Sequence, residues 1–268
     1  MADAAAPPPS PAFDESTLDS LIRAENASSC VLRPCSFFVA WNGVLTLVYS
    51  GFPPQLAKIK SKLNEAEFGL KKENFGSKWP KSTLGALNDK APSFTLEELA
   101  SLRSMCEEHA TRLGSLAVHV RRLSFVAYAR RSLEAVESRR RSDVDLLATT
   151  PPAAAAGEAA AAAEAASADE AAPSEEEIAR VRGVLSEWEP LAEYLPRVNA
   201  PGSRIGSYRE ASPAGTTLVA FLSTDGAPAE LVRIVAGFRA AVDAKFPGRY
   251  AWMESDSLHC TIRALSDA

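Results

Sequence analysis

Two short segments of the sequence share a pattern, HCTIRAL at residues 259–265 and KSTLGAL at residues 81–87. Thr, Ala and Leu occupy the same three of seven positions in both. Each segment follows an apolar stretch and then a helix-like stretch, FFVAW and PQLAKI in the first case, TLVAF and AELVRI in the second. The segments begin 40 and 38 residues after the last aromatic residue of these apolar stretches. The shared order and spacing predict a duplicated strand–helix–strand unit near residues 36–87 and 216–265.

The last strand of each unit is expected to have one apolar and one polar face, because strand side chains alternate between faces. In the second copy, Cys260 and its apolar neighbours in the alternation face the core, and the same alternation turns Ser82 inward in the first copy. The polar face is expected to consist of His259, Thr261 and Arg263 in the second copy and of Lys81 and Thr83 in the first.

A histidine two residues before a threonine on such a face suits phosphate chemistry. The hydroxyl can donate a hydrogen bond to a phosphate oxygen, and an imidazole transfers protons near neutral pH. Lys81 instead carries an amine with an ordinary pKa of about 10.4, which makes it a phosphate-holding cation and a poor base unless desolvation lowers that pKa. Ser82, Arg263 and Trp79 are further candidates for substrate binding. Trp79 either stacks on a base beside Lys81 or covers the core.

The stretch from TLVAFL through PAELVRIVAGFRAAV to YAWMESDSLHCTIRAL resembles the two-histidine (2H) phosphoesterases, the superfamily of the RNA 2′,3′-cyclic phosphodiesterases. The chain is also similar to proteins described as RNA ligase/cyclic nucleotide phosphodiesterase-like. The resemblance is good over residues 216–265 and weaker over 36–130. It implies that His259 and Thr261 match one His-x-Thr motif and that Thr83 matches the threonine of the other. Lys81 departs from the family by replacing the second histidine.

The resemblance further implies a bilobal α+β fold, in which two antiparallel sheets related by a pseudo-twofold axis line a central cleft and helices lie outside. It implies hydrolysis of 2′,3′-cyclic phosphates of nucleotides or RNA ends without a metal or another cofactor. In this hypothesis His259 transfers a proton, the two threonines bind phosphate and Lys81 stabilises charge. Losing one member of an acid–base pair commonly costs about 10²–10⁴ in rate. The alternative is therefore a catalytically weak protein that binds nucleotides or RNA ends, and a third hypothesis is an interaction scaffold.

Composition limits the classes of protein to which the chain can belong. The chain has 268 residues, 46% hydrophobic and 24% charged, and a net charge of −5, which is typical of a globular protein that meets a polyanion only through a local basic patch. No stretch approaches the apolar length of a membrane helix, and no basic residue precedes Arg23, so we expect a cytoplasmic protein, monomeric by default. The four cysteines lack the paired spacing of a zinc site and are expected to be reduced.

The remaining pattern divides the chain into a disordered segment 1–15, a first lobe 16–148, an Ala-rich linker 149–175 and a second lobe 176–268. Asn42-Gly43 is compatible with a hairpin turn between two strands or with a bulge in one long strand. Thr95 and Glu98 form the pattern of a capping box. We further expect a helix at 16–22, strands at 36–41, 44–49 and 116–128, helices from 54 and from 95 to 113, a charged helix at 133–147, a loop at 196–215, a strand at 216–223 and a helix at 228–245.

Overall fold

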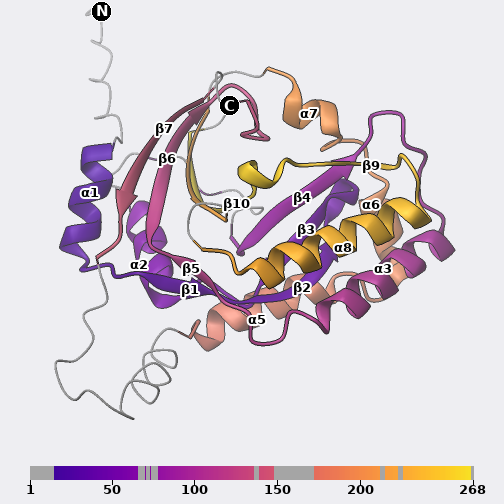
Figure 1. Ribbon diagram of the computed structural model, residues 1–268, viewed down its shortest axis with the longest axis horizontal. Helices are drawn as coiled ribbons and strands as arrows, with labels where there is room; N and C mark the ends of the chain where they lie inside the picture. Colours follow the sequence, from indigo (N-terminus) through magenta and orange to yellow (C-terminus); the bar gives the residue numbers. More distant parts are fainter. Residues whose placement is uncertain are drawn as a thin grey trace, which may run out of the picture.

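The computed structural model describes residues 15–65, 70, 73, 78–135, 139–147, 172–211, 215–222 and 226–266. Almost all of the expected disordered N-terminus and most of the expected Ala-rich linker lie outside these residues. The described part has an α+β fold, in which helices surround antiparallel sheets (Figure 1). No helix among the described residues is both long and apolar enough to span a bilayer.

Eight strands form the main sheet, and every pairing in it is antiparallel. A separate two-stranded sheet pairs β1 (Cys30–Leu32) with β5 (Val118–Val120). In spatial order the main sheet contains β2 (Pro34–Val39), β3 (Leu45–Tyr49), β4 (Lys81–Leu87), β10 (His259–Ser266), β8 (Gly215–Phe221), β6 (Arg122–Tyr128) and β7 (Arg139–Asp145), with β9 (Tyr250–Trp252) paired to β4.

The duplicated strand–helix–strand order is present in this sheet. One copy consists of β3, α2 (Pro54–Leu63) and β4, and the other of β8, α8 (Ala229–Lys245) and β10, with the short strand β9 inserted between α8 and β10. The two copies join directly, because β4 pairs with β10, so their strands belong to one continuous sheet rather than to a separate sheet for each copy. The sequence comparison also aligned the wrong first strand. β3, not the FFVAW stretch of β2, is the neighbour of β4 and the counterpart of β8.

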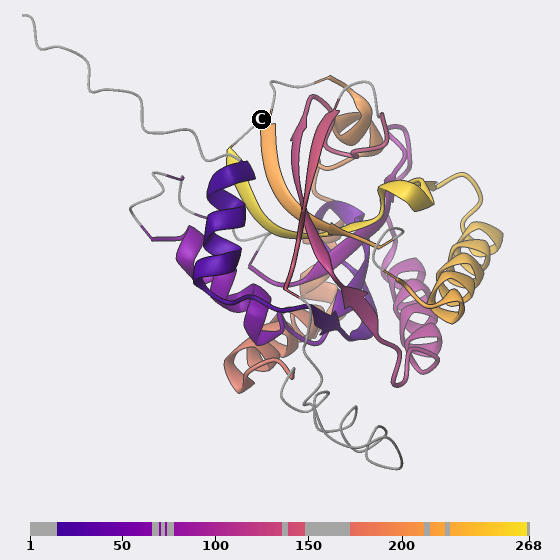
Figure 2. The ribbon, with the colours of Figure 1, turned by 60° about the vertical axis from the view of Figure 1, so that its left-hand side comes forward.

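The helices pack on the outside of the curved sheet (Figures 1 and 2). α3 packs on β2 and against α6 and α8, whereas α2 packs on β10 and α1 on β7. Phe37 of β2 stacks on Phe238 of α8 with 4.2 Å between ring centroids, deep in the apolar core. The remaining helices are α1 (Glu15–Ala24), α3 (Leu96–Ala110), α5 (Glu175–Ser186), α6 (Leu191–Val198) and α7 (Ile205–Arg209).

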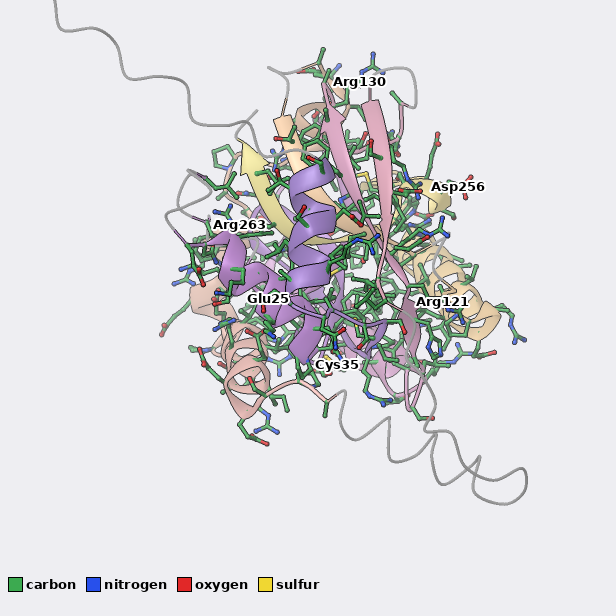
Figure 3. All side chains as sticks on the ribbon, turned by 90° about the vertical axis from the view of Figure 1, so that its left-hand side faces the viewer. Glu25, Cys35, Arg121, Arg130, Asp256 and Arg263 are labelled. Carbon is green, nitrogen blue, oxygen red and sulfur yellow. The ribbon has the colours of Figure 1, made fainter. Side chains whose placement is uncertain are left out.

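Several local predictions are confirmed. Thr95 and Glu98 form both hydrogen bonds of the capping box at the start of α3. Residues 41–43 form a tight 3₁₀ turn that closes the β2–β3 hairpin, with positive φ at Asn42 and Gly43. All four cysteines are free, and Cys35 lies at the surface (Figure 3).

The charged helix expected over 133–147 is wrong, because Arg139–Asp145 is the edge strand β7. Pairing with β6 along its whole length outweighs the helical preference of a charged segment. Ion pairs also cross this edge, from Arg122 to Asp143 and Asp145, and charged side chains are a common feature of edge strands. Short helices were missed as well, since α7 and the end of α6 fall in the expected loop at 196–215.

Two glycines provide a matched test of the hairpin. Gly43 has φ +73°, and a Cβ there would overlap the Leu87 side chain, whereas a Cβ on Gly183 inside α5 meets nothing within 4 Å. Gly43→Ala should lower the free energy of unfolding by more than about 1 kcal/mol. Gly183→Ala should raise it by about 0.5–1 kcal/mol, because alanine favours helix. Urea denaturation measures both, and a neutral or stabilising Gly43→Ala would contradict the turn.

Candidate active site

The centre of the main sheet brings the two similar segments together. β4 and β10 are antiparallel neighbours whose register places Cys260 opposite Ser82, and both of these side chains are fully buried. Because strand side chains alternate, the residues on either side of this pair project from the opposite face of the sheet. These flanking residues are Lys81 and Thr83 on β4 and His259 and Thr261 on β10.

All four flanking side chains line one cleft of about 630 Å³. The structure therefore brings Lys81 and Thr83 next to His259 and Thr261, which lie nearly 180 positions later in the sequence. The strand alternation predicts this arrangement. Their chemical roles stay predictions. The other polar or aromatic residues of the lining are Trp41, Thr46, Trp79, Tyr128, Arg131, Ser132, Glu187, Ser203, Tyr208, Thr217 and Ser257, with Phe38 at the floor.

The backbone just before β10 fixes the His259 imidazole. Its Nδ1 lies 2.6 Å from the carbonyl oxygen of Ser257, in the 3₁₀ turn Ser255–Ser257. A carbonyl oxygen can only accept a hydrogen bond, so Nδ1 carries the proton and donates it. The ring also packs edge-to-face on Phe221, with 5.8 Å between centroids. The neutral imidazole consequently has its lone pair on Nε2, which is the form that acts as a base.

Burial at Lys81 disfavours the charged form of its amine. The Trp79 ring, whose centroid is 4.1 Å from Nζ, favours the ammonium through a cation–π contact. Burial lowers the pKa of Lys81 from 10.5 to about 8, and the ammonium of Lys60 acts in the same direction, whereas Cys260 and Glu73 partly oppose the shift. The amine therefore changes protonation state close to physiological pH, which an ordinary exposed lysine does not do.

Of the two roles considered for Trp79, the structure favours covering the core. Its side chain is only 5% exposed and packs edge-to-face on Phe38, as expected of a core residue. The ring nevertheless forms part of the cleft lining and lies under the Lys81 ammonium. It contributes a cation–π contact to Lys81, and its burial leaves little surface for stacking on a base.

The four threonines of the lining differ in their hydrogen bonds. The hydroxyls of Thr46 and Thr217 each donate to a main-chain carbonyl oxygen, at 3.1 and 3.2 Å. Within the described part of the chain, the hydroxyls of Thr83 and Thr261 make no hydrogen bond, and both side chains are partly exposed. Only these two threonines, one from each copy of the repeat, have donors to offer a ligand in the cleft.

Two predicted binding residues are misplaced. Ser82 faces the core, where its hydroxyl and that of Tyr49 are 2.9 Å apart, so it is not a substrate contact. The alternation that placed Ser82 inward already excluded it from the cleft. It contributes to the packing that supports the strand instead.

Arg263 is the second correction. The pairing of β10 with β8 shifts by one residue between Thr261 and Arg263, which is a β-bulge at Ile262. A bulge reverses the alternation beyond it, so Arg263 faces away from the cleft and Ala264 lines it instead. Arg263 is 3% exposed and donates through Nε to Asn64 at 2.8 Å. Figure 3 shows Arg263 on the opposite side of the molecule from Asp256 of the preceding turn.

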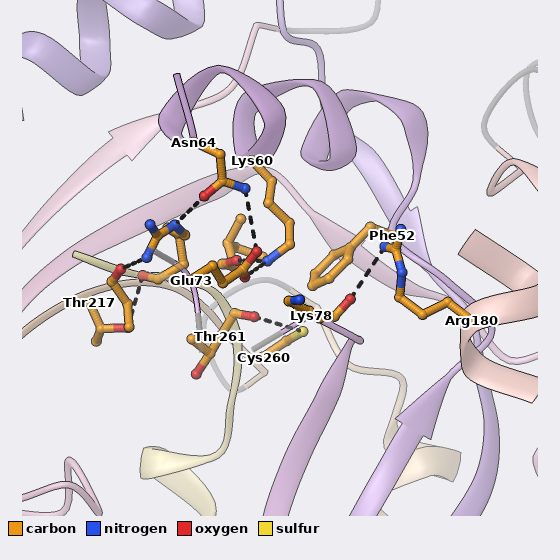
Figure 4. A network of polar contacts seen from close by, with 12 residues as sticks. Phe52, Lys60, Asn64, Glu73, Lys78, Arg180, Thr217, Cys260 and Thr261 are labelled. Atoms are coloured by element: carbon orange, nitrogen blue, oxygen red, sulfur yellow. Dashed lines mark hydrogen bonds and ion pairs between the residues drawn. The ribbon is translucent and has the colours of Figure 1, made fainter. Parts of the chain in front are cut away.

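A buried ion pair behind the sheet supports this bulge (Figure 4). Lys60 of α2 donates to the carbonyl oxygen of Ile262 at 2.9 Å and pairs with Glu73, and both charged side chains are nearly inaccessible. Sequence reasoning did not single out Lys60. Its spacing from Leu56 and Leu63 places it on the buried stripe of the helix, and that periodicity was the available signal.

The described residues contain no group of three or more His, Cys, Asp or Glu side chains that could hold a metal ion. Comparisons of the chain with protein-family models, with characterised proteins and with solved structures returned no match.

The lowered pKa of Lys81 makes stability depend on pH. Below about pH 8 the amine is protonated in both the folded and the unfolded chain, so folding must desolvate a charge. Between about pH 8 and 10.5 only the unfolded chain keeps the proton, and this cost fades as pH rises. Lys81→Met should therefore raise the free energy of unfolding at pH 7, by at most ~3 kcal/mol, with a difference that shrinks toward pH 10.

Denaturant unfolding at pH 7 to 10 measures this difference, and Lys90→Met at an exposed position is the control. The control should show no such trend. A Lys81→Met variant that is less stable than the parent at pH 7, or a difference that is constant with pH, would contradict the burial of the amine.

Proposed function

We propose that this protein is a metal-independent phosphoesterase that hydrolyses the 2′,3′-cyclic phosphate of nucleotides or RNA ends. The observation that carries the proposal is the convergence of Lys81, Thr83, His259 and Thr261 on one face of two adjacent central strands. The resemblance of the HCTIRAL segment to a His-x-Thr motif supports it, as does the duplicated strand–helix–strand order on both sides of the β4–β10 junction. The α+β class with antiparallel pairing is compatible with the 2H-type fold that the resemblance implies.

The phosphate of the substrate lies between the two threonines in this mechanism. Each hydroxyl donates a hydrogen bond to one non-bridging oxygen, and the ammonium of Lys81 attracts the same charge. These interactions strengthen as negative charge builds up on the phosphoryl oxygens in the transition state, which is the condition for catalysis rather than mere binding.

Proton transfer is assigned to His259 and Lys81. Nε2 of His259 takes a proton from the attacking water, whose oxygen forms the new bond to phosphorus. The bond from phosphorus to one ribose oxygen breaks, and Lys81 donates its proton to that oxygen, which yields a phosphate monoester and a free hydroxyl. An amine with a pKa of about 8 is mostly protonated at pH 7 and gives up its proton far more readily than an ordinary lysine.

Lys81 thus replaces a histidine as the acid, which is a stronger role than the charge stabilisation inferred from the sequence. The hydrogen bond from Nδ1 of His259 to Ser257 supports the assignment of the base, because it sets the tautomer with its lone pair on Nε2. The two residues are not interchangeable in this scheme, since only the lysine starts the reaction with the proton to be donated.

The pH–rate profile separates these roles. Hydrolysis of 2′,3′-cyclic nucleotides should decline above about pH 8, where Lys81 loses its proton. Lys81→Arg should abolish this decline, since a guanidinium does not deprotonate, and should lower kcat by about 10²–10⁴ because it donates no proton. His259→Ala should lower kcat/KM by about 10²–10⁴ at every pH.

His119→Ala, at an exposed position of β5, is the matched control and should leave the rate unchanged. Full activity in His259→Ala, or in Lys81→Arg, would remove the corresponding role. If cyclic phosphates are untouched between pH 5 and 9 while nucleoside 3′-monophosphates bind, the alternative of a nucleotide- or RNA-end-binding protein replaces the phosphoesterase.

A further inference from the structure

The cleft extends beyond the four central residues to a second end, near the hairpin turn and the C-terminus of α5. Trp41, Val184 and Glu187 line this end. Trp41 is 48% exposed, although large aromatic side chains are usually covered. An aromatic ring at the rim of this cleft is a surface on which a base can stack.

Glu187 and Arg197 hold the Trp41 indole in place. Its Nε1 donates to Oε2 of Glu187 at 2.8 Å. Arg197 of α6 donates to the same oxygen at 3.2 Å, and its guanidinium lies 5.2 Å from the centroid of the Trp41 ring. The two donors therefore fix both the ring and the carboxylate, at little further entropic cost when a ligand binds.

One carboxylate oxygen of Glu187, Oε1, remains available as a hydrogen-bond acceptor. Both donors use Oε2, and within the described residues Oε1 has no hydrogen-bond partner. The side chain lines the cleft and is 21% exposed, so this oxygen is a fixed, partly desolvated acceptor. A carboxylate oxygen can only accept hydrogen bonds and repels a carbonyl oxygen.

We propose that this end of the cleft binds the base of the substrate and that Glu187 Oε1 accepts a hydrogen bond from an exocyclic amino group. The site then favours adenine, cytosine and guanine over uracil, which presents carbonyl oxygens in place of an amino group. This selectivity rests on the proposed function, because the phosphate at Lys81 and His259 sets where the base lies.

Trp41 and Thr83 are separated both across and along the sheet. Two strand spacings, about 10 Å, separate β4 from β2, and Trp41 lies three residues, about 10 Å, beyond Phe38, which is level with Thr83. The two backbones are therefore about 14 Å apart, a gap that one nucleotide can span once both side chains extend into it. Trp79 and Phe38 line the cleft between Lys81 and Trp41, and Trp79 contacts both Lys81 and Phe38. A ribose between the phosphate and the base would cross this apolar floor.

Replacing the carboxylate by an amide gives a sharp test. In Glu187→Gln the amide oxygen must take the place of Oε2, because Trp41 and Arg197 both offer donors there. The amide NH₂ then replaces Oε1, and an acceptor becomes a donor. The variant should therefore lose its preference for amino-bearing bases and favour uracil, whose carbonyl oxygens accept.

The experiment compares the four nucleoside 3′-monophosphates by calorimetry and the four 2′,3′-cyclic nucleotides by hydrolysis. The parent protein should prefer the amino-bearing bases by about 10- to 100-fold, the range expected for a hydrogen bond to a charged group. Glu187→Gln should reverse the order. Glu193→Gln, at an exposed position of α6, is the matched control and should leave the order unchanged.

Equal affinities for all four bases, or an order that Glu187→Gln does not change, would overturn the inference and leave the phosphoesterase standing. If Glu187→Gln reverses the base preference in binding but no cyclic nucleotide is hydrolysed, the base site is supported and the phosphoesterase is rejected. If no nucleotide binds, both fail.

Discussion

Antiparallel pairing of β4 with β10 is the interaction on which the cleft depends. This pairing joins the last strands of the two strand–helix–strand copies, and β9 of the second copy extends the junction by pairing with the far end of β4. The pairing buries Ser82 and Cys260 and thereby turns their neighbours to the other face. A slip of one residue would send Lys81 and His259 into the core, so the register is set by the same hydrophobic pattern that sets the fold.

Charge is distributed unequally across the two faces of this junction. Behind the sheet, Lys60 is paired with Glu73 and holds a main-chain carbonyl of β10. In front, Lys81 rests on the Trp79 ring, and burial holds its pKa well below the ordinary value. The front face thus keeps an amine that is ready to release a proton, and the back face keeps the strand in place. Active sites commonly contain groups whose pKa is shifted by burial, as at Lys81, although the burial of a charge lowers stability.

The sequence was sufficient for most helices and strands and for the alternation on the central strands, because both follow from short-range periodicity. It placed Lys81, Thr83, His259 and Thr261 on one face correctly. It failed for Arg263, since one extra residue in a bulge reverses a face without any mark in the sequence. The other failures, β7 and the strand that matches β8, depend on which strand lies beside which, and periodicity carries no such information.

The central claim is that Thr83 and Thr261 bind one phosphate together. A double-mutant cycle tests it, with Thr83→Val, Thr261→Val and the double variant titrated with a nucleoside 3′-monophosphate by calorimetry. If both hydroxyls clamp the same phosphate, the two losses of binding free energy should be non-additive by about 0.5 kcal/mol or more. Losses that simply add, or single variants that bind as the parent does, would contradict a shared site.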